Sequence, residues 1–385
     1  MGSASLAIKT HFRKLKDPRR EGAVLHPLIN IVAIAVCGVI CGCDDWQQIA
    51  VFGVERKDWL SKFLSLGDGI PSHDTFERVF DRIDPKAFQR CFRQWTDALA
   101  EGLGLKHIAI DGKTLCGSRR GTLKALHLVS AWASENQLSM GQVACAEKSN
   151  EIAAIPELLE MLCIKGALVT IDAMGCQKEI AAAIRDKDGH YALTVKDNQP
   201  TLKADIGSSF EQAFATDFAG LDYDEHQSVD IGHGRKETRT YNIINNPQTL
   251  TTKDQWRDLN VIGMCLSERI EGYSEANPKG TRESAEVRYF IGSSKSGVKT
   301  YAKCLRGHWS IESMHWQLDV TFGEDDNRVS HRHGAENLAL LRKLALGLLK
   351  RHPSKKSIAC KRLAAALNTD FLEQVIAANV NSGNV

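Results

Sequence analysis

The chain has 385 residues, of which 43% are hydrophobic and 25% are charged, a composition that excludes a disordered, collagen-like or membrane-embedded protein. Its 49 Lys and Arg residues against 47 Asp and Glu leave a formal charge of +2, which neither supports nor excludes a nucleic-acid partner, because local patches decide such binding. The 11 cysteines are odd in number and scattered, so we expect free thiols in a reducing cytoplasm rather than a disulfide framework.

Residues 1–100 predict an all-α domain. The most apolar run, residues 31–43, has 13 residues and is shorter than the roughly 20 that span a bilayer, so we expect a buried helix and no membrane segment. The first 25 residues are polar and basic, without the apolar core of a signal peptide. Asp74 and Glu77 have the spacing of a capping box at a helix start.

The pattern of apolar residues changes after residue 102, where short apolar runs alternate with segments of helical periodicity. The predicted order is strand, strand, strand, helix, strand, helix, strand, and such alternation implies a partly parallel sheet with helices packed on it. These elements cover residues 107–111, 126–132, 138–145, 151–162, 167–172, 177–186 and 191–196.

Residues 205–295 predict a mostly β insertion with loops rich in Gly, Asn, Ser and Lys. Its expected strands are residues 241–244, 261–265 and 287–291. Helices are then expected over residues 299–322, 335–351 and 357–367.

Two acids end separate apolar strands, Asp111 and Asp172. Catalytic groups of α/β sheets collect at the carboxyl ends of strands, and a carboxylate at the end of a buried strand is costly unless a cation or hydrogen bonds compensate. The alternative is that each acid only caps a turn or the next helix. Because the two acids fall in the same predicted sheet, both interpretations stay open.

A third acid is expected from a later helix, in which His308, Glu312, His315 and Asp319 have the spacing of one helical face. The plain alternative is a surface helix with two satisfied histidines. A zinc site at the two histidines is disfavoured, because their spacing of seven residues lacks the His-Glu-x-x-His pattern.

Three carboxylates, two at strand ends and one on a helix, can hold two divalent ions that activate water or a 3′-hydroxyl for phosphodiester displacement. Oxygen ligands suit Mg²⁺, so Mg²⁺ is the expected cofactor, with Mn²⁺ as an alternative.

Several long motifs resemble those of bacterial insertion-sequence DDE transposases, in the branch that includes the H-repeat-associated proteins. The central motifs are DGKTL at residues 111–115, VTIDAMGCQ at 169–177 and HWSIESMHWQLDV at 308–320. Shorter matches are DDW at 44–46, IPSHDTF at 70–76, EKSNEI at 147–152, KDNQ at 196–199 and HGRKETR at 233–239. The resemblance therefore covers most of the chain.

The resemblance implies a ribonuclease-H-like catalytic core with a β-rich insertion before the last acid, preceded by an associated helical domain. Residue by residue, it implies that Asp111, Asp172 and Glu312 are the catalytic and metal-binding acids. In the wider superfamily the signature Tyr-x2-Arg-x3-Glu-x6-Lys would place Arg at position 308 and Lys at 319, where this chain has His308 and Asp319. We expect these two positions to contact DNA or to support the site differently. The role of Lys113 stays open.

Residues 328–362 form a basic tract with ten Lys and Arg and a single acid, Glu336. Such a tract neutralises phosphates and gives sequence-independent, salt-sensitive DNA binding, whereas the alternative is a solvated helix face. The DNA-contact candidates are Arg328, Arg332, Arg342, Lys343, Lys350 and Arg351 of the tract, with His308 and with Arg235 and Arg239 of the insertion.

The sequence thus predicts a DNA transposase that cleaves the ends of an insertion sequence and joins the freed 3′-hydroxyl to target DNA. A nuclease that does not join strands, or an inactive or domesticated DNA-binding remnant, is the alternative. The expected domains are residues 1–100, 101–350 and a basic tail at 351–385. We expect a cytoplasmic, nucleoid-associated protein that acts on double-stranded DNA, as a homodimer on its ends.

Overall fold

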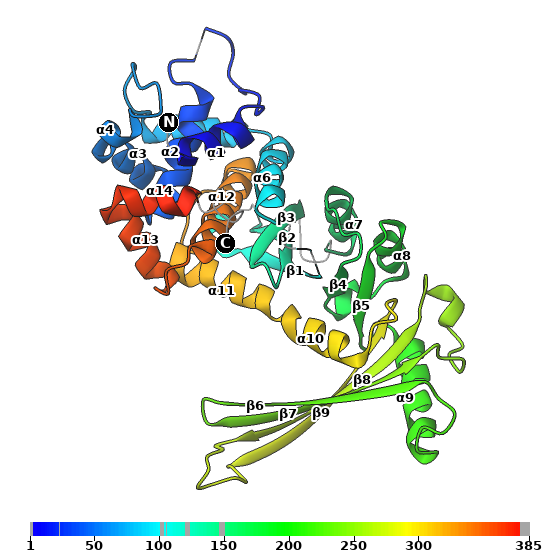
Figure 1. Cartoon of the computed structure of the whole chain (residues 1–385). Helices are drawn as coiled ribbons and strands as arrows, with labels where there is room; N and C mark the ends of the chain where they lie inside the picture. Colours follow the sequence, from blue (N-terminus) through cyan, green and yellow to red (C-terminus); the bar gives the residue numbers. More distant parts are fainter. Residues whose placement is uncertain are drawn as a thin grey trace. The chain divides into compact units, whose positions relative to one another are not determined.

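A computed structural model shows a mixed α/β protein with a large sheet and a helical N-terminal region (Figure 1). The structure describes residues 3–22, 24–100, 104, 106–119, 124–145 and 151–377. Four residues of the EKSNEI motif, 147–150, lie outside these ranges, as does the end of the basic tail beyond residue 377. No helix in the described part of the chain is long and apolar enough to cross a membrane.

The chain divides into two compact units. The first comprises Met1–Gly104, Gly112–Ala154 and Ile311–Val385, and the second comprises Leu105–Asp111 and Ile155–Ser310. The chain passes between the units four times, and one of these passages lies inside strand β1 (His107–Leu115), between Asp111 and Gly112. The helices after residue 311 belong to the same compact unit as the N-terminal helices.

The first unit is built around one buried helix, α12 (Arg332–Arg351), which packs against α2, α5, α6 and strand β3. Fifteen of its residues are buried, so the helices of residues 1–100 share their core with a helix from the C-terminal part of the chain. The apolar run predicted as a buried helix is α2, and Ile31–Ile40 are almost fully buried. The cap of α5 is Ser72 and not Asp74. The other elements of this unit are α1 (Ser3–Phe12), α2 (Leu28–Ile40), α3 (Trp46–Glu55), α4 (Lys57–Leu60), α5 (His73–Arg82), α6 (Pro85–Ala100), β2 (Leu126–Ala133), β3 (Leu138–Cys145), α11 (Ser310–Phe322), α13 (Ile358–Leu367) and α14 (Thr369–Ala377).

The second unit has the predicted parallel strands at its centre. Strand β1 (His107–Leu115) pairs in parallel with β4 (Leu168–Ile171), and β4 pairs in parallel with β5 (His190–Val195). Helices α7 (Glu151–Met161) and α8 (Lys178–Asp186) follow β3 and β4 along the chain, so the predicted order from β1 to β5 is confirmed.

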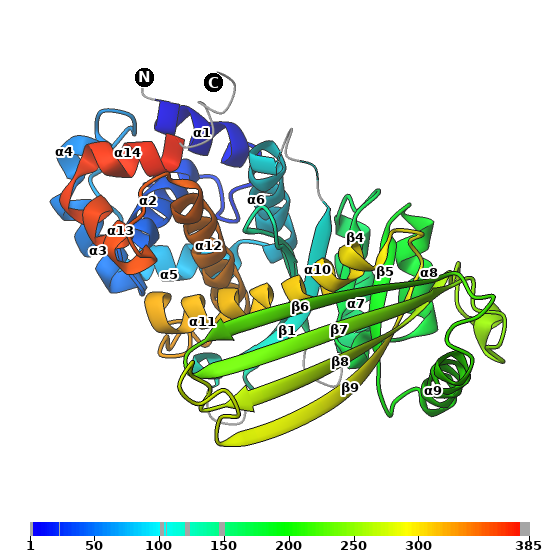
Figure 2. The ribbon, with the colours of Figure 1, turned by 60° about the horizontal axis from the view of Figure 1, so that its bottom comes forward.

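The insertion is longer and more regular than its apolar runs indicate. It begins with an unpredicted helix, α9 (Pro200–Ala215), which packs against β8 and β9 (Figure 2). Strands β6 (Tyr223–Gly232), β7 (Arg235–Asn245), β8 (Val261–Glu271) and β9 (Arg282–Gly292) then run side by side, and we call these four strands the arm (Figure 1).

The arm joins the parallel strands through β9, which pairs antiparallel with β5. The buried residues of β8 and β9 lie at the ends of these strands near β5, whereas β6 has no buried residue and the first six residues of β9 are exposed. Exposed polar strands carry no apolar alternation, which is why β6 and the outer halves of β7–β9 escaped prediction. At the buried end, a Cβ on Gly263 would collide with the ring of Phe290 on the neighbouring strand, so only glycine fits there.

The helix expected over residues 299–322 is two helices. Helix α10 (Val298–His308) ends before Trp309, and α11 begins at Ser310. Helix α10 belongs to the second unit and α11 to the first.

Candidate active site

Asp111 and Asp172 are brought together by the register of two neighbouring parallel strands. Ile110 of β1 is paired with Ile171 of β4, so each acid is the residue that directly follows a partnered isoleucine. Adjacent strands lie about 4.8 Å apart, and residues in the same register position point to the same face. The two acids therefore lie next to each other at the end of the β1–β4 pairing, although β1 itself continues to Leu115.

Asp172 also caps the turn that follows it. Its Oδ1 accepts hydrogen bonds from the backbone N–H of Met174 at 3.1 Å and of Gly175 at 3.3 Å. The capping interpretation left open by the sequence is therefore present, but both bonds use one oxygen. The side chain is exposed, and Oδ2 takes no part in the cap.

The KDNQ motif holds this turn in place. Asn198 donates to the backbone carbonyl of Ala173 at 2.8 Å, and Gln199 donates to that of Cys176 at 2.9 Å. These two amides explain why residues 196–199 accompany the 169–177 motif: they fix the loop that carries Asp172.

Three polar side chains form a chain beside Asp172. Thr170 Oγ1 is 2.7 Å from His107 Nε2 and 3.0 Å from His308 Nδ1. Burial lowers the pKa of His308, and the nearby Asp172 carboxylate opposes that shift. His308, at the end of α10, thus contacts the strand that leads to the second acid.

Glu312 is exposed in the first turn of α11 and belongs to the first unit. His315 of the same helix is buried with Ile311 and Leu318, and burial lowers its pKa to about 3, so it is neutral. The predicted polar face of His308, Glu312, His315 and Asp319 is therefore wrong, because His315 points into the core and His308 lies in another helix.

Lys113 connects β1 to the segment around the end of α11. It forms an ion pair with Asp319 and another with Glu324 at 2.8 Å, and it lies 3.6 Å from Asp325. The Glu324 side chain is 1% exposed. These carboxylates raise the pKa of Lys113 against the opposing effect of burial, so the ammonium stays charged.

A buried pair that the sequence did not single out lies next to Gly112. His127 Nε2 is 2.5 Å from Glu151 Oε1, and Thr114 Oγ1 is 2.8 Å from His127 Nδ1. A Cβ at Gly112 would collide with both His127 and Glu151. Gly112 of the DGKTL motif and Glu151 of the EKSNEI motif are thus spatial neighbours, which a single sequence does not reveal.

The basic tract is not one surface. Arg342 and Lys343 are 2% and 4% exposed; Arg342 donates to the Asp44 carbonyl, and Lys343 donates to Ser130 and Gln142. Their predicted DNA contact is corrected here, because α12 is a core helix and these cations satisfy buried acceptors. The tract's Lys361 and Arg362 are buried too.

The other candidates differ in exposure. Arg328 and Arg332 are exposed, whereas Lys350 and Arg351 are half-buried, and Lys350 lies over the Trp132 ring at 5.2 Å. In the arm, Arg235 is exposed, but Arg239 is 8% exposed and paired with Asp230 and Glu237.

Among the described residues, no group of three or more His, Cys, Asp and Glu side chains is close enough to hold a metal ion. The donor set of the candidate acids is carboxylate oxygen alone, which is the chemistry that hard divalent cations prefer.

Comparison with known proteins agrees with the motifs. Residues 9–96 match the DDE_Tnp_1-associated family, and residues 102–348 match the family described as Transposase DDE domain. "Putative transposase YncI" of Escherichia coli O157:H7 is 41% identical over 369 residues, covering 94% of this chain and 92% of that protein. "H repeat-associated putative transposase YhhI" of Escherichia coli K12 is 36% identical over 379 residues, covering 95% and 97%.

Among solved structures, the piggyBac transposase synaptic complex with hairpin DNA aligns with all of this chain and 83% of that one, at 9% identity and a TM-score of 0.41. That value is too low to support an argument about the fold. The two family matches and the relatives carry the assignment: the chain belongs to the family of transposases with a DDE domain.

Proposed function

We propose that this transposase cleaves DNA at the ends of an insertion sequence and transfers the freed 3′-hydroxyl to target DNA, using Asp111, Asp172 and Glu312 as its catalytic acids. The observation that carries the proposal is the register of β1 and β4, which sets Asp111 beside Asp172. The strand order from β1 to β5 supports a ribonuclease-H-like core with the arm as its insertion.

In this proposal the three carboxylates hold divalent ions, Mg²⁺ in the first place and Mn²⁺ as an alternative. Such ions, when bound, activate a water or hydroxyl nucleophile and stabilise the leaving oxygen of the phosphodiester. Asp172 can bind through Oδ2 because its other oxygen is used by the cap. Thr170 and His308 contact each other at the strand that leads to Asp172.

Double-stranded DNA is the proposed substrate, both as element ends and as target, with two copies of the chain acting on paired ends. Association with the nucleoid would follow from that binding. The exposed Arg328 and Arg332 are the tract residues that we retain as backbone contacts.

The test is cleavage and joining of labelled DNA that carries the element's ends, in Mg²⁺, by the wild type and Asp172→Asn. We expect the variant to fold and to lose nearly all cleavage. Asp186→Asn is the matched control, because Asp186 is an exposed aspartate in the same unit and is the last residue of α8. Full cleavage by folded Asp172→Asn would contradict the proposed site. Cleavage without joining by the wild type would favour a nuclease, and DNA binding without cleavage would favour a remnant.

A further inference from the structure

The second unit contains a cavity of about 80 Å³ between α10 and the strands β4, β5, β7, β8 and β9. A buried water needs at least about 10–15 Å³ of such volume, so this space has room for several waters. It is therefore large enough for a phosphate group but not for a duplex, which would have to approach from outside.

Three arginines are the charged residues in the lining of this cavity, which otherwise consists of apolar, aromatic and neutral polar side chains and His308. Arg239, Arg288 and Arg306 all line it, and none of the residues that line it is an aspartate or glutamate. Each guanidinium carries five N–H donors, and arginine is the side chain whose planar fork matches phosphate oxygens.

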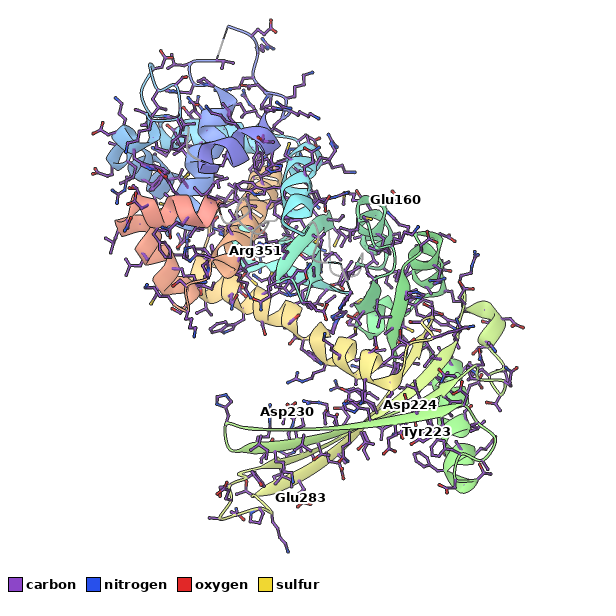
Figure 3. All side chains as sticks on the ribbon, viewed as in Figure 1. Glu160, Tyr223, Asp224, Asp230, Glu283 and Arg351 are labelled. Atoms are coloured by element: carbon purple, nitrogen blue, oxygen red, sulfur yellow. The ribbon has the colours of Figure 1, made fainter. Side chains whose placement is uncertain are left out.

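Carboxylates outside the lining hold two of the arginines in place. Arg288 donates to Glu286 through Nε at 2.8 Å and Nη2 at 2.9 Å, and Arg239 pairs with Glu237 at 2.7 Å and with Asp230. Asp230 lies on strand β6 of the arm (Figure 3). These partners reduce the net charge, but they also fix the guanidinium groups before a ligand arrives, which lowers the entropic cost of binding.

Arg306 is the most available of the three. Its only ion pair among the described residues is with Asp230 at 3.7 Å, beyond hydrogen-bond distance, and its side chain is 50% exposed. Next to it Arg288 lies over the Trp309 ring at 5.6 Å, which orients the second guanidinium against a flat surface.

The cavity adjoins the candidate site. Thr170 and Ile171, the two residues before Asp172, line it, and so does His308. An anion bound here would lie next to the strand end that carries the second acid, within the same unit.

We propose that this cavity binds one phosphate group of the DNA backbone, held by Arg288 and Arg306 with Arg239 behind them, close to the phosphodiester that is cleaved. The inference rests on the proposed function for the identity of the substrate, but it is tested by binding alone. It goes beyond the residues of the motifs described above, because Arg288 and Arg306 lie outside all of these stretches.

The experiment measures binding of a labelled duplex to the full chain over a range of salt concentrations, without divalent metal. A protein that neutralises one phosphate fewer should show a slope of log affinity against log salt that is smaller by about 0.9. We expect that reduction for Arg288→Gln/Arg306→Gln, and we expect Arg288→Lys/Arg306→Lys to restore the slope because lysine keeps the charge.

The matched control is Arg257→Gln. Arg257 is 61% exposed and pairs with Asp186 at 3.7 Å, much like Arg306 with Asp230, but it does not line the cavity. Its slope should equal that of the wild type. Melting temperatures of all variants establish that they are folded.

An unchanged slope in the folded glutamine variant would overturn the proposal. A second experiment uses inorganic phosphate as the probe. If phosphate raises the melting temperature of the wild type but not of the glutamine variant, and the salt slope of DNA binding is the same in both proteins, then the cavity binds free phosphate and not DNA. If the wild type binds DNA with the expected slopes but never cleaves it, the proposed function fails while this inference stands.

Discussion

Lys113 of β1 forms an ion pair with Asp319 of α11, two helical turns after Glu312. The signature of the wider superfamily has a lysine at the helix position that Asp319 occupies here. A cation is thus present beside this part of the helix, but the strand supplies it. The departure from the signature is a pair of compensating residues, separated by 206 positions.

The first prediction concerns the stability that this pair provides. Lys113→Met should lower the free energy of unfolding by roughly 3 kcal/mol, because it leaves the buried Glu324 carboxylate without its ion-pair partner. Denaturant unfolding followed by circular dichroism measures the change. Lys165→Met is the control: Lys165 and Asp188 are 79% and 73% exposed, so their pair should be worth less than about 1 kcal/mol. Equal stability of Lys113→Met and the wild type would contradict this role.

The second prediction concerns pH. Burial lowers the pKa of Lys343 from 10.5 to about 8. Between these values the unfolded chain keeps a proton that the folded chain has lost, so the contribution of Lys343 to stability rises with pH across that window.

Lys343→Met removes this titration, and its loss of the Ser130 and Gln142 hydrogen bonds does not depend on pH. The melting temperature of the wild type minus that of the variant should therefore increase from pH 7.5 to pH 9.5. The corresponding difference in the free energy of unfolding should grow by at most about 1.4 kcal/mol per pH unit. Taking the difference cancels the titration of other groups. A difference that stays constant would show that the ammonium is not desolvated.

The third prediction separates exposed from buried cations of the basic tract. Arg328→Gln/Arg332→Gln should weaken binding to all DNA sequences alike and reduce the salt slope by about 0.9 for each phosphate that is no longer neutralised. Lys62→Gln, at an exposed lysine of the same unit, should leave the slope unchanged. The measurement is the salt dependence of binding to two duplexes of unrelated sequence. Equal slopes for the wild type and both variants would show that Arg328 and Arg332 do not contact DNA.

The fourth prediction distinguishes the two roles of Asp172. Without divalent metal, Asp172→Asn should melt at the wild-type temperature or slightly above it, because the amide oxygen still caps the turn and the repulsion from Asp111 is lost. Asp172→Ala should lose about 0.5–2 kcal/mol with the cap. If Asn destabilised as much as Ala, the carboxylate charge itself would be structural. Thermal unfolding in a metal-chelating buffer gives the answer.

Local patterns in the sequence were enough to predict the elements from β1 to β5, the buried helix α2 and the position of Asp172 directly after β4. These features depend on runs of apolar residues and on the acids that follow them. Such a run predicts a buried element from only a few consecutive residues, without knowledge of the rest of the chain. The prediction that Asp111 ends its strand was wrong, because β1 continues to Leu115. The same patterns failed for the exposed halves of the arm, where alternation is absent because both faces are polar.

The features that only the tertiary structure determined are contacts between residues far apart in the chain. The register that puts Asp111 beside Asp172, the pairing of Lys113 with Asp319 and the packing of Gly112 on Glu151 depend on which strands and helices become neighbours. The charge count of residues 328–362 is a property of sequence, but whether a cation faces solvent is decided by packing. Arg342 and Lys343 show this most clearly, since the core around α12 surrounds them and supplies the oxygen acceptors that make their burial tolerable.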